Sequence, residues 1–97
     1  MSAFVVADIQ IENPEEYEKY KQLVKPIAEK YGGNYRVRGG DMDVRETDLW
    51  TPSRMVIIEF PDMEAARGFF DSAEYAPVKP LRRDHAKCTV VILDGSE

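Results

Sequence analysis

Two carboxylates and one arginine are the residues of this sequence whose types and positions best suit chemistry. Asp8 and Glu59 occupy polar positions in two apolar segments, and Arg38 ends a third segment just before Gly39 and Gly40. Two carboxylates beside a guanidinium in a cavity shielded from water could hold a polarised substrate, with one carboxylate acting as a general base. The alternative is an ion-pair cluster that neutralises charges inside a dimer interface.

Four further residues are candidates for lining a ligand site beside Arg38. Gly39 has no side chain, so a ligand could approach the backbone there. Tyr20 is expected to pack in the core, with its hydroxyl reaching the edge of the pocket. Trp50 lies in an irregular segment, where we expect it to hold a second subunit rather than to line a pocket mouth. His85 is interpreted as a surface or capping residue, with the roles of general base and haem ligand as alternatives.

The sequence offers no set of residues for a metal or an organic cofactor. His85 is the only histidine and Cys88 the only cysteine. A metal site and an intrachain disulfide are therefore not expected. Cys88 is predicted to be a buried strand residue.

The segment before His85 contains prolines that argue against a regular helix. Pro77 and Pro80 lead us to expect no such helix over residues 75–83, and this also argues against a haem-binding helix there. Arg82 and Arg83 are interpreted as a solvated basic pair, with a clamp for an anionic ligand as the alternative.

The elements that position these residues alternate between strands and helices. Alternation of apolar residues predicts strands over residues 4–11, 34–38, 54–60 and 87–93. A first helix is expected from the Asn13 cap to the glycine stop at Gly32, and a second one after the Asp62 cap. Residues 41–52 are expected to be irregular or hairpin-like.

This order of elements predicts a single ferredoxin-like domain over residues 1–97, of the α+β class. The βαββαβ order gives an antiparallel four-stranded sheet, in which the strands over residues 4–11 and 54–60 are central. We expect these two central strands to run parallel to each other, joined by right-handed crossovers.

One face of this sheet is expected to lack a helical cover. Val6, Met55 and Ile57 project from that face and make it too apolar for contact with water. We therefore expect a homodimer in which two sheets face each other, which is the arrangement of a dimeric α/β-barrel.

Charge and hydropathy exclude several kinds of partner. The net charge is −5, from 13 basic and 18 acidic residues, which argues against a nucleic-acid binder. An RNA-recognition domain of this topology would display aromatic residues where Asp8 and Glu59 stand. No apolar run approaches the roughly 20 residues of a membrane helix, and no signal peptide is visible. We therefore expect a cytoplasmic protein.

Several segments together resemble the family called domain of unknown function 1330. They are FVVAD (4–8), NPEEY (13–17), YGGNYRVRGG (31–40), SRMVIIEFP (53–61), EAAR (64–67), SAEY (72–75) and KPLR (79–82). The resemblance extends from about residue 4 to residue 93. It implies a dimeric α/β-barrel of ferredoxin-like subunits and no established activity. The wider superfamily includes cofactor-free monooxygenases, lactone isomerases, haem enzymes and plain ligand binders.

Three hypotheses about function follow from the sequence. The first is a small homodimeric enzyme without a cofactor that binds a small organic molecule between sheet and helices. Arg38 would then anchor the molecule, and Asp8 or Glu59 would take a proton. The second is a non-catalytic dimeric binding module with the same cavity. The third is a purely structural dimer whose charged residues are interfacial.

Overall fold

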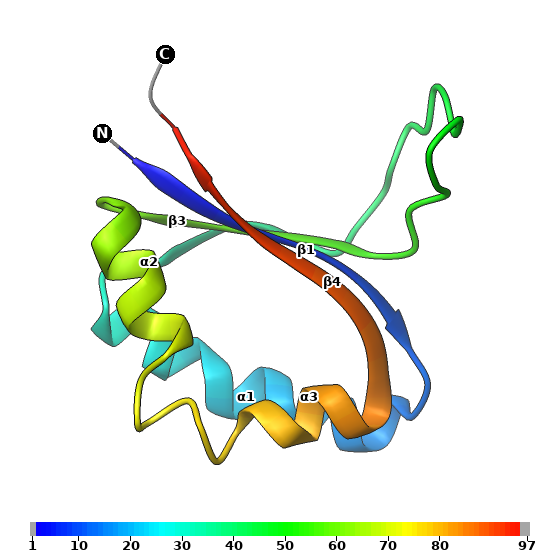
Figure 1. Cartoon of the computed structure of the whole chain (residues 1–97). Coiled ribbons are helices and arrows are strands. Elements are labelled where there is room, and N and C mark those ends of the chain that lie inside the picture. The colour runs from blue at the N-terminus through cyan, green and yellow to red at the C-terminus, as the bar shows by residue number, and fades with distance from the viewer. Residues whose placement is uncertain (1, 96–97) are drawn as a thin grey trace.

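The structure, a computed structural model, describes residues 2–95 and has the ferredoxin-like α+β fold that the sequence predicts. Its elements are β1 (Ala3–Ile11), α1 (Pro14–Lys30), β2 (Asn34–Arg38), β3 (Met55–Phe60), α2 (Met63–Phe70), α3 (Lys79–His85) and β4 (Ala86–Asp94). The four strands form one antiparallel sheet in the order β2-β3-β1-β4. All three helices lie on one side of this sheet, and the segment that joins β2 to β3 projects from the other side (Figure 1).

β1 and β3 are the central strands, as predicted, but they run antiparallel rather than parallel. Val5 pairs with Ile58 and Asp8 pairs with Met55 in opposite chain directions. The handedness rule for crossovers applies to β1 and β2, which α1 connects. These two strands are not neighbours, because β3 returns from β2 and inserts between them. The expectation of parallel central strands was therefore wrong.

Both predicted helix starts carry the expected side-chain caps. The Asn13 side chain accepts a hydrogen bond from the backbone N–H of Glu16 at 3.3 Å, and Asp62 accepts one from Ala65 at 2.8 Å. These bonds satisfy amides that have no partner within the helix. Gly32 follows α1 with a φ of 89°, a conformation in which glycine avoids the steric cost of a side chain.

A third helix, α3, forms where the sequence led us to expect none. Pro80 lies in its first turn. An amide in the first turn of a helix has no intrahelical acceptor, so the missing N–H of a proline costs nothing there. The prolines therefore mark the start of a helix, and the expectation of no regular helix over residues 75–83 was wrong.

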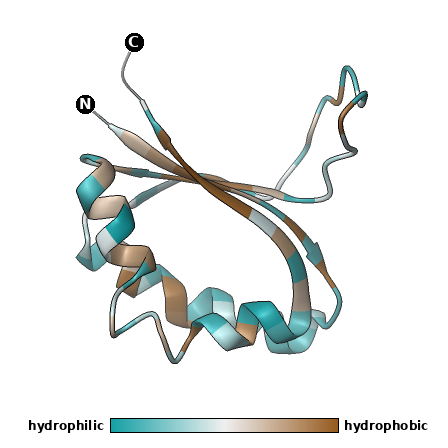
Figure 2. Ribbon diagram, in the orientation of Figure 1, coloured by the Kyte–Doolittle hydropathy of each residue, from teal (hydrophilic) through white to brown (hydrophobic). Residues whose placement is uncertain are grey.

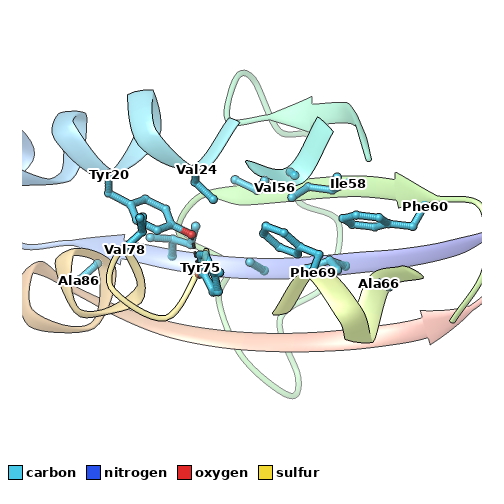
Figure 3. Close-up of a cluster of buried hydrophobic side chains, with 14 of the residues drawn as sticks. Tyr20, Val24, Val56, Ile58, Phe60, Ala66, Phe69, Tyr75, Val78 and Ala86 are labelled. Carbon is cyan, nitrogen blue, oxygen red and sulfur yellow. Dashed lines mark hydrogen bonds between the residues drawn. The ribbon is translucent and has the colours of Figure 1, made fainter. Parts of the chain in front are cut away.

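The helix-covered face of the sheet carries the core. Alternate residues of β1 and β3 are buried against the helices, and Phe60 and Phe69 stack with ring centroids 5.4 Å apart. Figure 3 shows side chains from α1, α2, β3 and the α2–α3 connection meeting in this core. Strongly hydrophobic residues are concentrated in the strands (Figure 2).

None of the helices in residues 2–95 covers the opposite face, here called the open face. Val91 and Leu93 of β4 are 43% and 50% exposed there, and Trp50 of the β2–β3 segment is 57% exposed. Val6 and Met55, which the sequence places on this face, are half-buried. A contiguous apolar surface of this kind commonly marks an interaction site.

A β-bulge in β2 changes which of its residues face the helices. Tyr35 and Val37 pair with consecutive residues of β3, so Arg36 is an extra residue between them. One extra residue shifts the alternation of side chains by one position. As a result Tyr35 and Arg38 both face the helices although they are three residues apart, and Arg36 is on the open face.

Candidate functional site

The structure does not bring Asp8, Glu59 and Arg38 together. Asp8 pairs with Met55, and Glu59 pairs with Phe4, so the two carboxylates are four positions apart along the same pair of strands. At about 3.3 Å per residue, this separation is about 13 Å. Both carboxylates lie on the open face, whereas Arg38 faces the helices because of the β2 bulge.

Asp8 holds the end of the β2–β3 segment in place. Its carboxylate accepts hydrogen bonds from the backbone amides of Ser53 and Arg54, at 2.8 and 3.1 Å, and from the Trp50 indole at 2.9 Å. Burial alone would raise the pKa of Asp8, but the bonds from Ser53, Arg54 and Trp50 outweigh it and lower the pKa. Three donors therefore already occupy this carboxylate.

Glu59 also has partners within the chain. It accepts hydrogen bonds from the Ser2 hydroxyl and from Arg36 Nε at 2.8 Å. These two bonds lower the pKa of the Glu59 carboxyl, with the larger contribution coming from Ser2. For Glu59, this geometry corresponds to the ion-pair alternative, with Arg36 as the cation in place of Arg38.

A cavity of about 40 Å³ lies on the other side of the sheet, between the strands and the helices. Apolar side chains of β1, β3, β4, α1 and α2 form most of its wall. Its polar groups come from four basic residues and four tyrosines: Lys21, Arg38, Arg54, Arg82, Tyr17, Tyr20, Tyr35 and Tyr75. Within the described part of the chain, no carboxylate lines this cavity.

A chain of hydrogen bonds links three residues of the cavity wall. The hydroxyls of Tyr20 and Tyr75 are 2.8 Å apart, and Arg82 Nε donates to the Tyr75 hydroxyl at 3.2 Å. Figure 3 shows the two tyrosines pointing toward each other from α1 and from the α2–α3 connection. Burial raises the pKa of Tyr20 far above its usual range, so its hydroxyl keeps its proton. Tyr75 is only 1% exposed, so it is a core residue although it lies in a connection between two helices.

Arg38 and Arg54 supply two further guanidiniums to the cavity wall. Arg38 donates to the backbone carbonyl of Lys21 at 2.8 Å, and its guanidinium carbon is 4.6 Å from the centre of the Tyr35 ring. Arg54 donates to the backbone carbonyl of Arg38 at 3.3 Å and lies 5.8 Å from the ring of Tyr17. Each guanidinium is thus positioned by a tyrosine ring and a backbone carbonyl, and neither contact uses its full set of donors.

The phenols of Tyr17 and Tyr35 are neutral at physiological pH. Burial is the largest cause and raises the pKa of each to about 12. Positive charge opposes this rise: Arg54 and Arg82 lower the pKa of Tyr17, and Arg38 lowers that of Tyr35. The hydroxyls therefore lie in the electric field of the three guanidiniums.

Gly39 makes room for a side chain of the protein. Its φ is 74°, and a Cβ at this position would lie 2.8 Å from Arg54 Nε. Its amide donates to the carbonyl of Met55 at 2.9 Å. The glycine therefore lets the Arg54 side chain pass close to the backbone on its way to the cavity.

The remaining predicted ligand residues are divided between different parts of the molecule. Tyr20 and Arg38 line the cavity, whereas Trp50 lies on the open face and His85 ends α3. The backbone carbonyl of His85 accepts bonds from the amides of Glu12 and Asn13, at 2.8 and 3.1 Å. Across residues 2–95, no three His, Cys, Asp or Glu residues gather in a way that could hold a metal ion.

The sequence contained signals for the cavity residues that were missed. Arg54 alternates with Val56 and Ile58, so it belongs to the buried side of the third predicted strand. A charged residue on an apolar strand face needs a polar destination inside the fold. Tyr75 lies in the α2–α3 connection, outside α3, so no helical spacing in the sequence links it to Arg82.

Comparison with solved structures shows the same fold in several proteins of low sequence identity. A protein of unknown function from Rhodopseudomonas palustris has a TM-score of 0.74 at 15% identity, with 99% of this chain and 83% of that chain covered. A dimeric ferredoxin-like protein of unknown function from Jannaschia sp. CCS1 has a TM-score of 0.74 at 12% identity, with 97% and 99% covered. SnoaB, a cofactor-independent oxygenase from Streptomyces nogalater, has a TM-score of 0.68 at 15% identity, with 99% and 94% covered.

These likenesses establish the fold and leave the activity open. No curated protein matches the sequence. No helix in residues 2–95 is both long and apolar enough to cross a membrane. The family model described as domain of unknown function (DUF1330) matches residues 2–96, nearly the whole chain. The chain therefore belongs to the DUF1330 family.

Proposed function

We propose that the protein binds a small organic molecule in the cavity between the sheet and the helices. The observation that carries this proposal is the meeting of several polar groups in an otherwise apolar cavity. They are Tyr20, Tyr75 and Arg82, which a chain of hydrogen bonds links, together with Arg38 and Arg54. Apolar walls with a few converging polar groups are characteristic of small-molecule sites. The arrangement favours this cavity over the open-face carboxylates as the site.

The size of the cavity limits what it can enclose. A water molecule needs about 10–15 Å³ in this measure, so 40 Å³ accommodates roughly three waters. A molecule with a head group of that size fits without rearrangement, and a larger body requires lining side chains to move. We therefore propose a small ligand, or the head of a longer one.

A second candidate function is catalysis on the bound molecule without a cofactor. The specific observation in its favour is the hydrogen bond from Arg82 to the Tyr75 hydroxyl, because a guanidinium stabilises the phenolate that proton transfer would create. The cofactor-independent oxygenase SnoaB has the same fold, although this likeness supports catalysis only by analogy. In this role Tyr75 would exchange a proton with the ligand. Asp8 and Glu59 would have no part in it, because they lie across the sheet.

We also propose that the open face forms a homodimer, as the sequence suggested. A hollow of about 520 Å³ on this face is lined by Val6, Trp50, Met55, Val91 and Leu93, with Asp8 and Thr89. This hollow is larger than the cavity, but it is apolar and open, which suits the surface of a second subunit better than a small ligand. The Jannaschia protein, which has the same fold, is described as dimeric.

Sedimentation velocity tests the dimer. The protein should sediment as a species of twice 11.1 kDa. Val91→Glu, which places a charge on the open face, should shift it to the monomer, whereas Ala73→Glu at an exposed position outside the sheet should not. A monomeric protein at micromolar concentration would contradict the proposal.

The cavity is tested with a variant that fills it. Ala7 of β1 lines the cavity, and Val6 points to the opposite face of the same strand. Binding is measured by protein-observed NMR with a fragment set that contains neutral and anionic molecules. Ala7→Leu should abolish the shifts that these fragments cause at Tyr20 and Tyr75, whereas the matched control Val6→Leu should leave them unchanged. Fragment shifts that survive Ala7→Leu in a folded variant would place the site elsewhere.

A further inference from the structure

We propose that the ligand of this cavity is an anion, specifically a small monocarboxylate with an apolar body. This inference rests on the proposed function, because it names the chemical class of the molecule that the cavity binds.

The charge around the cavity is opposite in sign to the net charge of the whole chain. The chain has 18 acidic and 13 basic residues, yet the four charged residues that line the cavity are all basic. Lys21 has a carboxylate partner, Glu18, at 3.5 Å. None of the ion pairs found among residues 2–95 involves Arg38, Arg54 or Arg82. An acidic protein has therefore gathered three guanidiniums around one cavity without a carboxylate to neutralise them.

The guanidinium of Arg82 belongs to a buried side chain that is only 6% exposed. Its side-chain partners are the Tyr75 hydroxyl at 3.2 Å and the Cys88 thiol, and neither of these is a carboxylate. A buried guanidinium is unfavourable unless it is paired with an opposite charge. No such charge comes from the described residues around the cavity, so an anionic ligand would supply it.

The donors and the apolar wall of the cavity determine what kind of anion fits it. Arg38 and Arg54 have guanidinium donors left over, and the buried tyrosine hydroxyls add further hydrogen-bond donors. Guanidiniums bind carboxylate oxygens with particularly good geometry. The rest of the wall consists of alanine, valine, isoleucine and phenylalanine side chains, which favour an apolar body over a second charged group. A monocarboxylate combines these features, whereas inorganic phosphate would leave the apolar wall unmatched.

The experiment compares acids with amides of nearly the same shape. Propionate and propionamide, and benzoate and benzamide, are titrated into the ¹⁵N-labelled protein at pH 7 and low ionic strength. The readouts are the arginine Nε–H resonances and the dissociation constants. We expect each carboxylate to bind at least about tenfold more tightly than its amide, because charge-assisted hydrogen bonds are the stronger ones.

Variants show whether the guanidiniums cause the difference. Arg38→Gln and Arg54→Gln change partly exposed residues and are expected to weaken carboxylate binding roughly tenfold without affecting amide binding. Arg82→Gln tests the buried guanidinium, and the other two variants keep the test valid if this one fails to fold. Arg83→Gln, one residue along α3 and exposed, is the matched control that should leave binding unchanged.

The possible outcomes separate this inference from the proposed function. If the amides bind as tightly as the acids and the arginine variants bind like the original protein, the cavity is a binding site but the anion inference is wrong. If none of the four probes shifts a cavity resonance, both the inference and the proposed function are refuted. Tighter binding of the acids that Arg83→Gln abolishes and Arg38→Gln does not would place the anion outside the cavity, and would also refute the inference.

Discussion

Replacement of Tyr75 by phenylalanine should destabilise the protein far more than the same replacement of Tyr20. The two hydroxyls are hydrogen-bonded to each other at 2.8 Å, but their other contacts differ. Tyr75 also accepts the bond from Arg82, so its hydroxyl is the middle member of the chain. Tyr75→Phe removes a hydrogen-bond partner from both Tyr20 and Arg82, whereas Tyr20→Phe leaves Tyr75 bonded to Arg82.

The expected magnitudes follow from which groups lose a partner. In Tyr75→Phe, the buried Tyr20 hydroxyl loses its partner, which costs about 1–3 kcal/mol, and Arg82 loses an acceptor for a charged donor, which costs about 1.5–3 kcal/mol. The sum is roughly 2.5–6 kcal/mol, a large share of the stability of a small domain. In Tyr20→Phe, one neutral hydrogen bond is lost at about 0.5–1.5 kcal/mol.

Urea unfolding followed by circular dichroism measures this difference. With an m-value of about 1.5 kcal/mol/M, Tyr75→Phe should lower the midpoint by roughly 2–4 M, and Tyr20→Phe by less than roughly 1 M. All samples need the same protein concentration, because the stability of an oligomer depends on it. The double variant should be no less stable than Tyr75→Phe alone, because it removes the stranded Tyr20 hydroxyl.

Equal midpoint shifts for the two single variants would refute this reasoning. So would a double variant whose loss equals the sum of the two single losses. Either result would mean that the Tyr75 hydroxyl is not the shared partner of Tyr20 and Arg82, and that the Arg82 side chain has its main partner elsewhere.

Three further predictions concern residues outside this chain of hydrogen bonds. Gly33→Ala should cost about 1–3 kcal/mol by overpacking, because the added Cβ would lie 2.9 Å from a helix carbonyl and from an aromatic ring of the core; an unchanged urea midpoint would contradict this. Hydrogen bonds from Lys30 and from a tyrosine hydroxyl hold the pKa of Glu74 at about 2, so its stabilising effect is present above about pH 4.5 and is lost as the pH falls toward 2. Glu74→Gln should therefore flatten the dependence of thermal stability on pH in that window, by a small amount because the pair is exposed, and an unaltered slope would count against it. Asp8→Asn places an amide N–H against the indole N–H of Trp50, so the fluorescence of this single tryptophan should shift toward that of a fully exposed indole; an unchanged emission maximum would argue against the bond.

Much of the fold was predictable because local signals and the global pattern agree. The Asn13 and Asp62 caps, the apolar alternation of β1 and β3 and the uncovered second face all appear where the sequence places them. Each of these depends on residues within a few positions of one another. The direction of β3 relative to β1 depends on the whole path of the chain, and it was predicted wrongly.

The candidate site was predicted less well, and the bulge explains part of the failure. Counting by twos along β2 from Tyr35 puts Arg38 on the open face, where Asp8 and Glu59 are. The extra residue at Arg36 reverses this assignment, and no turn residue or proline marks its position in the sequence. The cavity was expected between sheet and helices, but most of its polar lining was not.

The burial of Arg82 and Tyr75 was missed for a different reason. Pro80 was interpreted as a helix breaker, although a proline in the first turn favours a helix. Once α3 is present, Arg82 points to the core and Arg83 to solvent, so the two halves of the basic pair have different environments. Neither a solvated pair nor a two-residue clamp describes this arrangement fully.

The bulge in β2 also determines how this strand would tolerate a change of length. Deletion of Arg36 would leave Tyr35, Val37 and Arg38 opposite their present partners, since Arg36 is the residue without one. The shortened strand would be a regular ladder, and its main loss would be the exposed ion pair with Glu59. A deletion inside β3 would instead move each later side chain of that strand to the opposite face of the sheet. The edge strand β2 thus contains one residue more than its pairing with β3 requires. Arg38 can stay inside the fold whether that residue is kept or lost.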